Sequence, residues 1–196
     1  MTRPTHLSRA RGFALAALLI TTSPLMTACN DGPSRPDAKE YPDNGGVIFD
    51  GDPRITQMSG IHADAGQRVA FGATLVTNTT ADVATLKNAT LSGDVSTDDA
   101  EIVNMFVHDP QDGQGGQLGA APWPYQDFPT IVEPLAGHTL EKGEKLAVLF
   151  VIDVKKTGAW TWPITRVVYE QDGTTFETSV TFGFQVCPTA TETCER

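Results

Sequence analysis

The dipeptide Asp172-Gly173 lies between two arms in which apolar and polar residues alternate. This pattern is the strongest short-range signal for a β-hairpin, because a type I′ turn requires a positive φ at both central positions. A two-residue loop also fixes the register, so Gln171 is predicted to pair with Thr174 and Tyr169 with Phe176. The core face of the hairpin then joins Tyr169 to a row of phenylalanines on the second arm.

The same register places further residues of this hairpin. Val167 is expected opposite Thr178, and Arg166 and Glu177 are expected to be diagonal neighbours on the outer face. Pro163 has no N–H group to donate to a strand ladder, so it predicts an edge or a bulge.

The rest of the chain from Val47 onward also alternates with a period of two and has no sustained helical stripe. Residues 146–154 (LAVLFVIDV) are apolar on both parities, which predicts a central strand covered on both faces. Strict alternation assigns other residues to shared faces. One such face holds Val69, Phe71, Ala73 and Leu75, and another holds Ile102, Asn104 and Phe106 opposite Val103, Met105 and Val107.

Strands at this spacing, separated by turns rich in Gly, Asp and Asn, predict an all-β fold of about seven to nine strands. The pattern over residues 47–187 resembles immunoglobulin-like domains, which implies an antiparallel β-sandwich. The Cys…Trp…Cys arrangement of true immunoglobulin domains is absent, so the resemblance implies no particular function.

The first 28 residues have the pattern of a secretory signal peptide. Three arginines give a positive start, and no acidic residue precedes Asp31. The apolar run at residues 13–20 (FALAALLI) is far shorter than the roughly 20 residues that a membrane-spanning helix needs. We expect residues 1–28 to be removed on export.

The junction LMTAC, residues 25–29, resembles the lipobox of bacterial lipoproteins. The resemblance implies that Cys29 becomes the first residue and carries acyl chains, palmitate included, that anchor the protein in a membrane. Two or more acyl chains are what stable anchoring requires. Three cysteines are an odd number for an exported protein, and lipidation of Cys29 leaves Cys187 and Cys194 as a pair.

Composition limits the partners of the exported chain. Removing residues 1–28 takes away three Arg and no acid, so the net charge falls from −10 to −13. Such an acidic protein is a poor match for nucleic acid. Residues 29–46, rich in Pro, Gly and acids, predict a flexible tether between the lipid and the folded domain.

Cys187 and Cys194 follow the last predicted strand and lie close together in the sequence. Exported chains meet an oxidising environment, so we expect a disulfide that closes the C-terminal tail, residues 188–196. A redox function would favour a C-x-x-C pair beside a βαβ unit, and neither is found.

No motif for catalysis, cofactor binding or metal binding occurs in the sequence. His62, His108 and His138 have no metal-ligand spacing, and the acidic stretch 109–116 lacks the ligand series of a calcium loop. There is no G-x-S-x-G elbow for a nucleophilic serine. The prediction is therefore a protein without an enzymatic activity, a cofactor or a metal.

The segment at residues 110–137 is long for a connection in a compact domain, and such loops are usually functional or disordered. It contains Trp123, Tyr125 and Phe128, each next to a proline. Two interpretations stay open. The loop is either a lid, with Trp123 buried over the second face of the strand at residues 146–154, or a binding loop for a protein or carbohydrate ligand.

Together these observations predict a lipid-anchored protein on the extracytoplasmic side of the cell membrane, acting as a non-enzymatic binding or scaffold module of the cell envelope. The alternative is a small envelope enzyme or metal-binding protein whose site is assembled across loops.

Overall fold

The computed structural model describes residues 45–50, 57–110, 118–124, 132–190 and 194. Within these ranges the chain is all-β without a helix, and it has thirteen strands, more than the seven to nine predicted. In chain order they are β1 (Val47–Phe49), β2 (Gln57–His62), β3 (Arg68–Asn78), β4 (Ala84–Ser92), β5 (Ala100–His108), β6 (Leu118–Pro122), β7 (Glu133–Pro134), β8 (Thr139–Leu140), β9 (Lys145–Val154), β10 (Trp160–Trp162), β11 (Ile164–Gln171), β12 (Thr174–Val180) and β13 (Phe182–Cys187). The excess arises because single residues interrupt long strands and because β7 and β8 are only two residues long.

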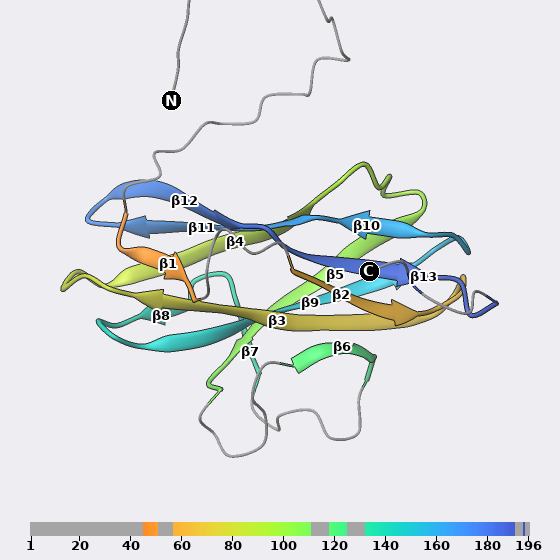
Figure 1. Cartoon of the computed structure of the whole chain (residues 1–196). Helices are drawn as coiled ribbons and strands as arrows, with labels where there is room; N and C mark the ends of the chain where they lie inside the picture. Colours follow the sequence, from red (N-terminus) through yellow and green to blue (C-terminus); the bar gives the residue numbers. More distant parts are fainter. Residues whose placement is uncertain (1–44, 51–56, 111–117, 125–131, 191–193, 195–196) are drawn as a thin grey trace, which may run out of the picture. The chain divides into compact units, whose positions relative to one another are not determined.

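The first layer is a sheet in the order β1-β3-β9-β5-β7, with β6 added along β3 (Figure 1). Its central strand β9 is buried without a break from Leu146 to Ile152. This confirms the prediction of a strand covered on both faces.

The second layer is built on one long hairpin that runs from β10 and β11 into β12 and β13. Strand β4 pairs with β11, and β8 pairs with β4. At the other end of the hairpin, β2 pairs with β13. The β2–β13 pair is parallel, in contrast to the antiparallel pairing of every other strand pair in the described residues. A parallel pair cannot be joined by a tight turn, and these two strands are far apart in the sequence.

The hairpin has the predicted register, with Gln171 opposite Thr174 and Tyr169 opposite Phe176. Asp172 and Gly173 have φ of 47° and 70°, as a type I′ turn requires. The register continues through Val167 opposite Thr178 and Thr165 opposite Val180.

Two further details of the hairpin follow the prediction. Arg166 and Glu177 form an ion pair of 2.7 Å on its outer face. Beside Pro163, three positions separate Trp162 from Thr165, whereas four separate their partners Phe184 and Val180. The strand opposite Pro163 therefore bulges by one residue.

Bulges also overturn two of the predicted face assignments. The register of β3 shifts between Phe71 and Thr74, so Val69 and Phe71 face the core while Leu75 lies beside Ala147 on the other face. The register of β5 shifts between Ile102 and Asn104, which leaves Ile102 on the core side. Each extra residue reverses the alternation after it, so strict parity was wrong in the second half of both strands.

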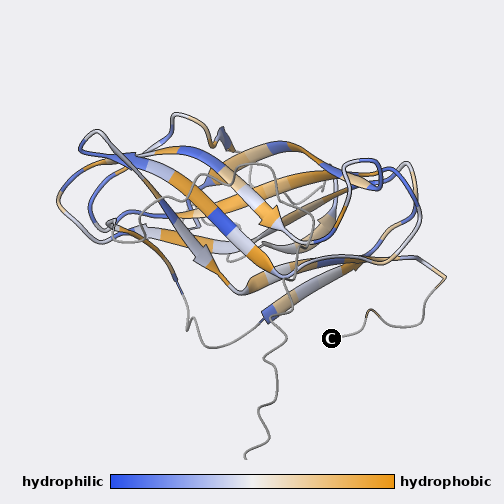
Figure 2. Cartoon of the chain, turned by 90° about the horizontal axis from the view of Figure 1, so that it is seen from above, coloured by the Kyte–Doolittle hydropathy of each residue, from blue (hydrophilic) through white to orange (hydrophobic). Residues whose placement is uncertain are grey.

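The core lies between the two layers and is rich in aromatic rings. Phe71 of β3 stacks on Phe150 of the same sheet, with ring centroids 6.2 Å apart, and on Phe184 of the opposite layer at 4.9 Å. Along the strands hydrophobic segments alternate with hydrophilic ones, and many of the loops are hydrophilic (Figure 2). The described residues thus form an immunoglobulin-like β-sandwich, as predicted.

A buried polar cluster ties three connections of the sandwich together. Asn78 is fully buried, and its amide donates to the carbonyl oxygens of Asp82 at 2.8 Å and Leu140 at 2.9 Å. Its side-chain oxygen accepts from the backbone N–H and the hydroxyl of Thr80. Gln171 extends the cluster by donating to the same hydroxyl. All four hydrogen-bonding positions of the Asn78 amide are therefore used.

Of the C-terminal tail, Pro188, Thr189 and Cys194 lie beside β2 and the residues directly after it. Cys187 and Cys194 form the predicted disulfide, with their Cα atoms 5.7 Å apart. The disulfide sulfur of Cys194 lies 3.8 Å from the carbonyl oxygen of Ile61, and the backbone N–H of Thr189 donates to Asp64 at 3.3 Å.

Candidate functional site

The outer face of the first layer carries both apolar and charged side chains. Val148 and Phe150 of β9 belong to the core, so the alternate residues Leu149, Val151 and Asp153 face outward. Leu149 and Val151 are nevertheless completely buried. The outer face of this sheet is therefore covered along much of its length.

Trp123 contributes to this cover. Phe106 lies next to Leu149 in the register of β5 and β9, and the Trp123 ring stacks on Phe106 with centroids 6.0 Å apart and planes 17° from parallel. Strand β6 positions the tryptophan, because it pairs with β3 up to Pro122 and the N–H of Trp123 then donates to the carbonyl oxygen of Arg68 at 2.9 Å. Trp123 is half-buried. Its exposure lies between that expected of a buried lid residue and that expected of an exposed binding residue.

An open groove of about 530 Å³ runs beside Trp123. Its volume lies within the roughly 300–1,000 Å³ that is usual for small-molecule sites. Trp123 and Pro124 give the groove an apolar part, and charged side chains of Arg68 on β3, Asp153 on β9 and Lys155, which follows β9, also line it. The groove residues used below are Gln67, Arg68, Trp123, Pro124, Asp153 and Lys155.

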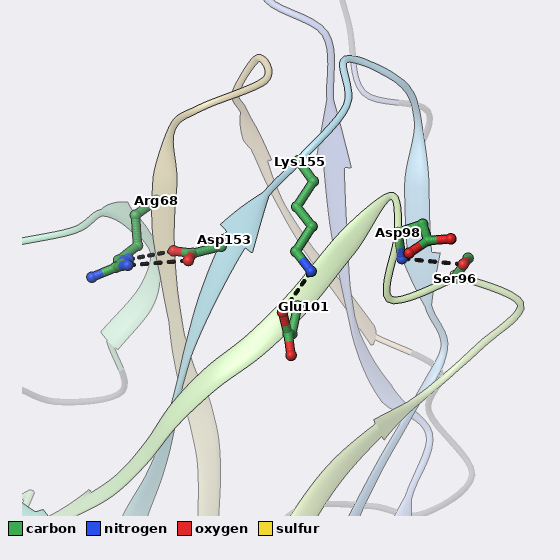
Figure 3. Close-up of polar contacts among 6 residues, drawn as sticks. All are labelled: Arg68, Ser96, Asp98, Glu101, Asp153 and Lys155. Carbon is green, nitrogen blue, oxygen red and sulfur yellow. Dashed lines mark hydrogen bonds and ion pairs between the residues drawn. The ribbon is translucent and has the colours of Figure 1, made fainter.

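The charged residues that line the groove belong to two ion pairs, Arg68 with Asp153 and Lys155 with Glu101 (Figure 3), of which Glu101 is not a lining residue. The guanidinium of Arg68 donates to both carboxylate oxygens of Asp153, through Nε to Oδ1 and through Nη2 to Oδ2 at 3.1 Å. Lys155 pairs with Glu101 at 2.6 Å. Asp153 lies between Arg68 and Glu101 in the register of three neighbouring strands, so these groups line one side of the sheet.

The ion pairing shifts two pKa values in the groove. The hydrogen bonds with Asp153 raise the pKa of Arg68, and the same bonds lower the pKa of Asp153. Both groups therefore stay charged across the neutral range. With one carboxylate for each cation, the four side chains of the two pairs carry no net charge.

A second cavity, of about 140 Å³, lies at the end of β5 beside His108 and His138. His138 is 3.2 Å from Glu133, and Nδ1 of the buried His108 is 3.3 Å from the carbonyl oxygen of Asp109. In the described ranges no three His, Cys, Asp or Glu residues are grouped as metal ligands. His62 lies on β2 and contacts the carbonyl oxygen of Pro188.

Of the three aromatic residues predicted for this site, Trp123 is among the residues that the structure describes. Trp123 borders the groove, while Tyr125, Phe128 and the lipidation residue Cys29 lie outside the described residues. Sequence reasoning missed Arg68, Asp153 and Lys155. Arg68 and Asp153 are 85 positions apart, so no local motif joins them, although Asp153 interrupts an apolar run and was the signal available.

No protein-family model matches the sequence, and no curated protein matches it significantly. Among solved structures, the chain is similar to the VesB protease of Vibrio cholerae, at 13% identity and a TM-score of 0.37 over 72% of this chain and 32% of the protease. The PapD-like domain 7 of human CEP192 is similar at 11% identity and a TM-score of 0.35, over 80% of this chain and 94% of that domain.

A family 123 glycoside hydrolase from Clostridium perfringens is also similar, at 11% identity and a TM-score of 0.39 over 73% of this chain and 27% of the enzyme. The chain thus spans about a third of the protease and about a quarter of the hydrolase. These likenesses concern the backbone only, and no activity of those proteins is carried over.

In the part of the chain that the structure describes, no helix is both long and apolar enough to cross a membrane.

Proposed function

We propose that the chain is an exported lipoprotein, anchored in the cell membrane through Cys29, that acts as a non-enzymatic binding module of the cell envelope. The lipobox-like junction at residues 25–29 supports the anchor. The partly exposed Trp123 ring lines the same groove as the Arg68–Asp153 ion pair and carries the binding function, because the groove combines an aromatic surface with fixed polar groups.

The anchoring function is tested with Cys29→Ser. The substitution removes the thiol that would be acylated, so the protein should move from the membrane fraction to a soluble or uncleaved form. Mass spectrometry of the N-terminal peptide identifies the acyl chains in the parent protein. An unmodified, intact N-terminus and unchanged fractionation would refute the anchor.

The binding function is tested by retention on delipidated envelope fragments. The whole lipidated protein, kept soluble in a sugar-free detergent, should sediment with the fragments. Trp123→Ala should abolish this retention, because the groove loses its aromatic wall. Trp160→Phe is the matched control, since Trp160 packs against the core and does not line the groove. Equal retention of the parent and Trp123→Ala would contradict the proposal.

A further inference from the structure

We propose that the groove beside Trp123 binds a neutral carbohydrate, with a pyranose ring lying between the indole and the Arg68–Asp153 ion pair. This inference rests on the proposed function of the groove as a binding site. It adds the chemical class of the ligand, which three properties of the groove identify: its charge, the arrangement of its apolar and polar walls, and the hydrogen bonding of its main chain.

The charge of the groove favours a neutral ligand. Arg68 is paired with Asp153 and Lys155 with Glu101, so each cation of the groove already has a carboxylate partner. An anionic ligand such as a phosphate or a uronic acid would have to displace one of these carboxylates. A cationic ligand would meet the guanidinium and the ammonium groups. A neutral ligand avoids both costs.

The walls of the groove fit a molecule with one apolar and one polar edge. The axial C–H groups of a pyranose form an apolar face, which packs on an aromatic ring such as Trp123. Its adjacent equatorial hydroxyl groups both donate and accept hydrogen bonds. The ion pair holds partners for both kinds of hydrogen bond next to each other, because Arg68 supplies N–H donors and Asp153 supplies carboxylate acceptors.

The side chains that meet the sugar are held in place. Asp153 fixes the guanidinium plane through two hydrogen bonds. Phe106 supports the indole ring through stacking. Fixed groups lose little conformational entropy when a ligand binds, which favours recognition of a weakly binding, hydrated ligand.

The main chain of the groove argues against an extended peptide. A peptide strand binds by adding to unpaired N–H and C=O groups at a sheet edge. Here the N–H of Gly66 donates to Val154 at 2.8 Å, the N–H of Val154 donates to Gln67 at 2.9 Å, and the carbonyl of Arg68 accepts from Trp123. These groups are used within the protein, so recognition in the groove depends on side chains.

The test uses the whole lipidated protein in a sugar-free detergent, with its three tryptophans replaced by fluorotryptophan. Substitution of each tryptophan assigns the three ¹⁹F resonances. The probes are cellotriose, maltotriose and chitotriose as neutral sugars, trigalacturonate as an anionic sugar, and an uncharged peptide of similar length. We expect at least one neutral sugar, at millimolar concentration, to shift the Trp123 resonance and leave the Trp160 resonance in place.

Variants test the two walls separately. Trp123→Ala should weaken the binding of that sugar by about tenfold or more, and Arg68→Lys should weaken it severalfold because a lysine keeps the charge but not the two-pronged geometry. Trp160→Phe should bind as the parent does. Thermal melts of the variants establish that each is folded.

Three results would overturn the inference: no neutral sugar shifts the Trp123 resonance, trigalacturonate or the peptide binds more tightly than every neutral sugar, or Trp123→Ala binds the sugar as well as the parent. If retention on envelope fragments still requires Trp123 in that case, the binding module stands and only the carbohydrate is lost. If retention is also independent of Trp123, the proposed function fails as well.

Discussion

Arg68 and Asp153 form a bidentate ion pair between strands β3 and β9, on the outer face of the sheet and at the edge of the groove. The pair connects the charged side of the groove to the central strand of the fold. Its pKa shifts predict how the groove responds to pH.

Hydrogen bonds from Arg68 lower the pKa of Asp153, so its carboxylate stays ionised as pH falls to the ordinary aspartate value of about 3.9 and is neutralised only below it. Ligand binding in the groove should therefore be constant between about pH 5 and about pH 8 and should decline as the pH falls through the lowered pKa. The Trp123 ¹⁹F resonance, followed in a pH titration with and without ligand, measures this. A transition near neutral pH would contradict the role of this pair.

Trp123→Ala is expected to lower the free energy of unfolding by about 1–2 kcal/mol, because the ring is half-buried and stacks on Phe106. Substitution by alanine would lower the free energy of unfolding by about 3–5 kcal/mol if the ring were a fully buried lid residue. It would change that free energy by less than about 0.5 kcal/mol if the ring were exposed. Chemical denaturation distinguishes these values. A loss above about 3 kcal/mol would make the ring part of the core and remove the basis for a binding surface.

Asn78→Ala should lower the free energy of unfolding by about 1–3 kcal/mol, because it removes the side-chain donor to the buried carbonyl oxygen of Leu140 and one of the two side-chain donors to that of Asp82, the other being Gln171. The control is Asn88→Ala on β4, the next strand in the chain, where the side chain is exposed. That substitution should stay within about 0.5 kcal/mol of the parent in the same denaturation assay. Equal effects of the two substitutions would refute the structural role of the cluster.

The Cys187–Cys194 disulfide closes a short loop at the end of the chain, so its removal should cost about 2.5 kcal/mol without preventing folding. Cys187→Ser is less suitable for this test because Cys187 is buried. Cys194→Ser combined with thermal melting gives the cleaner value. Peptide mapping without reductant should recover both cysteines in one linked fragment, and two freely alkylated thiols would rule out the bridge.

The hairpin at Asp172-Gly173 was predictable down to its register because one local turn type determines it. Burial of β9 on both faces was predictable because the strand is apolar on both parities. The faces of β3 and β5 were predicted wrongly beyond their bulges, since a single inserted residue reverses the alternation. Gly72 beside the β3 shift was the one local signal of such a bulge.

The groove was predictable only in part. Trp123 was a candidate because an aromatic residue between prolines stands out in a long connection. Arg68 and Asp153 were not, because their pairing depends on the order of strands in the sheet, and charged residues at strand ends are common.

The central claim, that the groove beside Trp123 is an occupied binding surface in the cell envelope, is tested most directly by photo-crosslinking in living cells. A photoreactive amino acid replaces Gln67, an exposed residue of the groove, or Lys87, an exposed residue of β4 in the other layer. The account predicts a discrete adduct from position 67 that disappears with Trp123→Ala, and no such adduct from position 87. Identical adducts from both positions, or an adduct at position 67 that persists in Trp123→Ala, would contradict it.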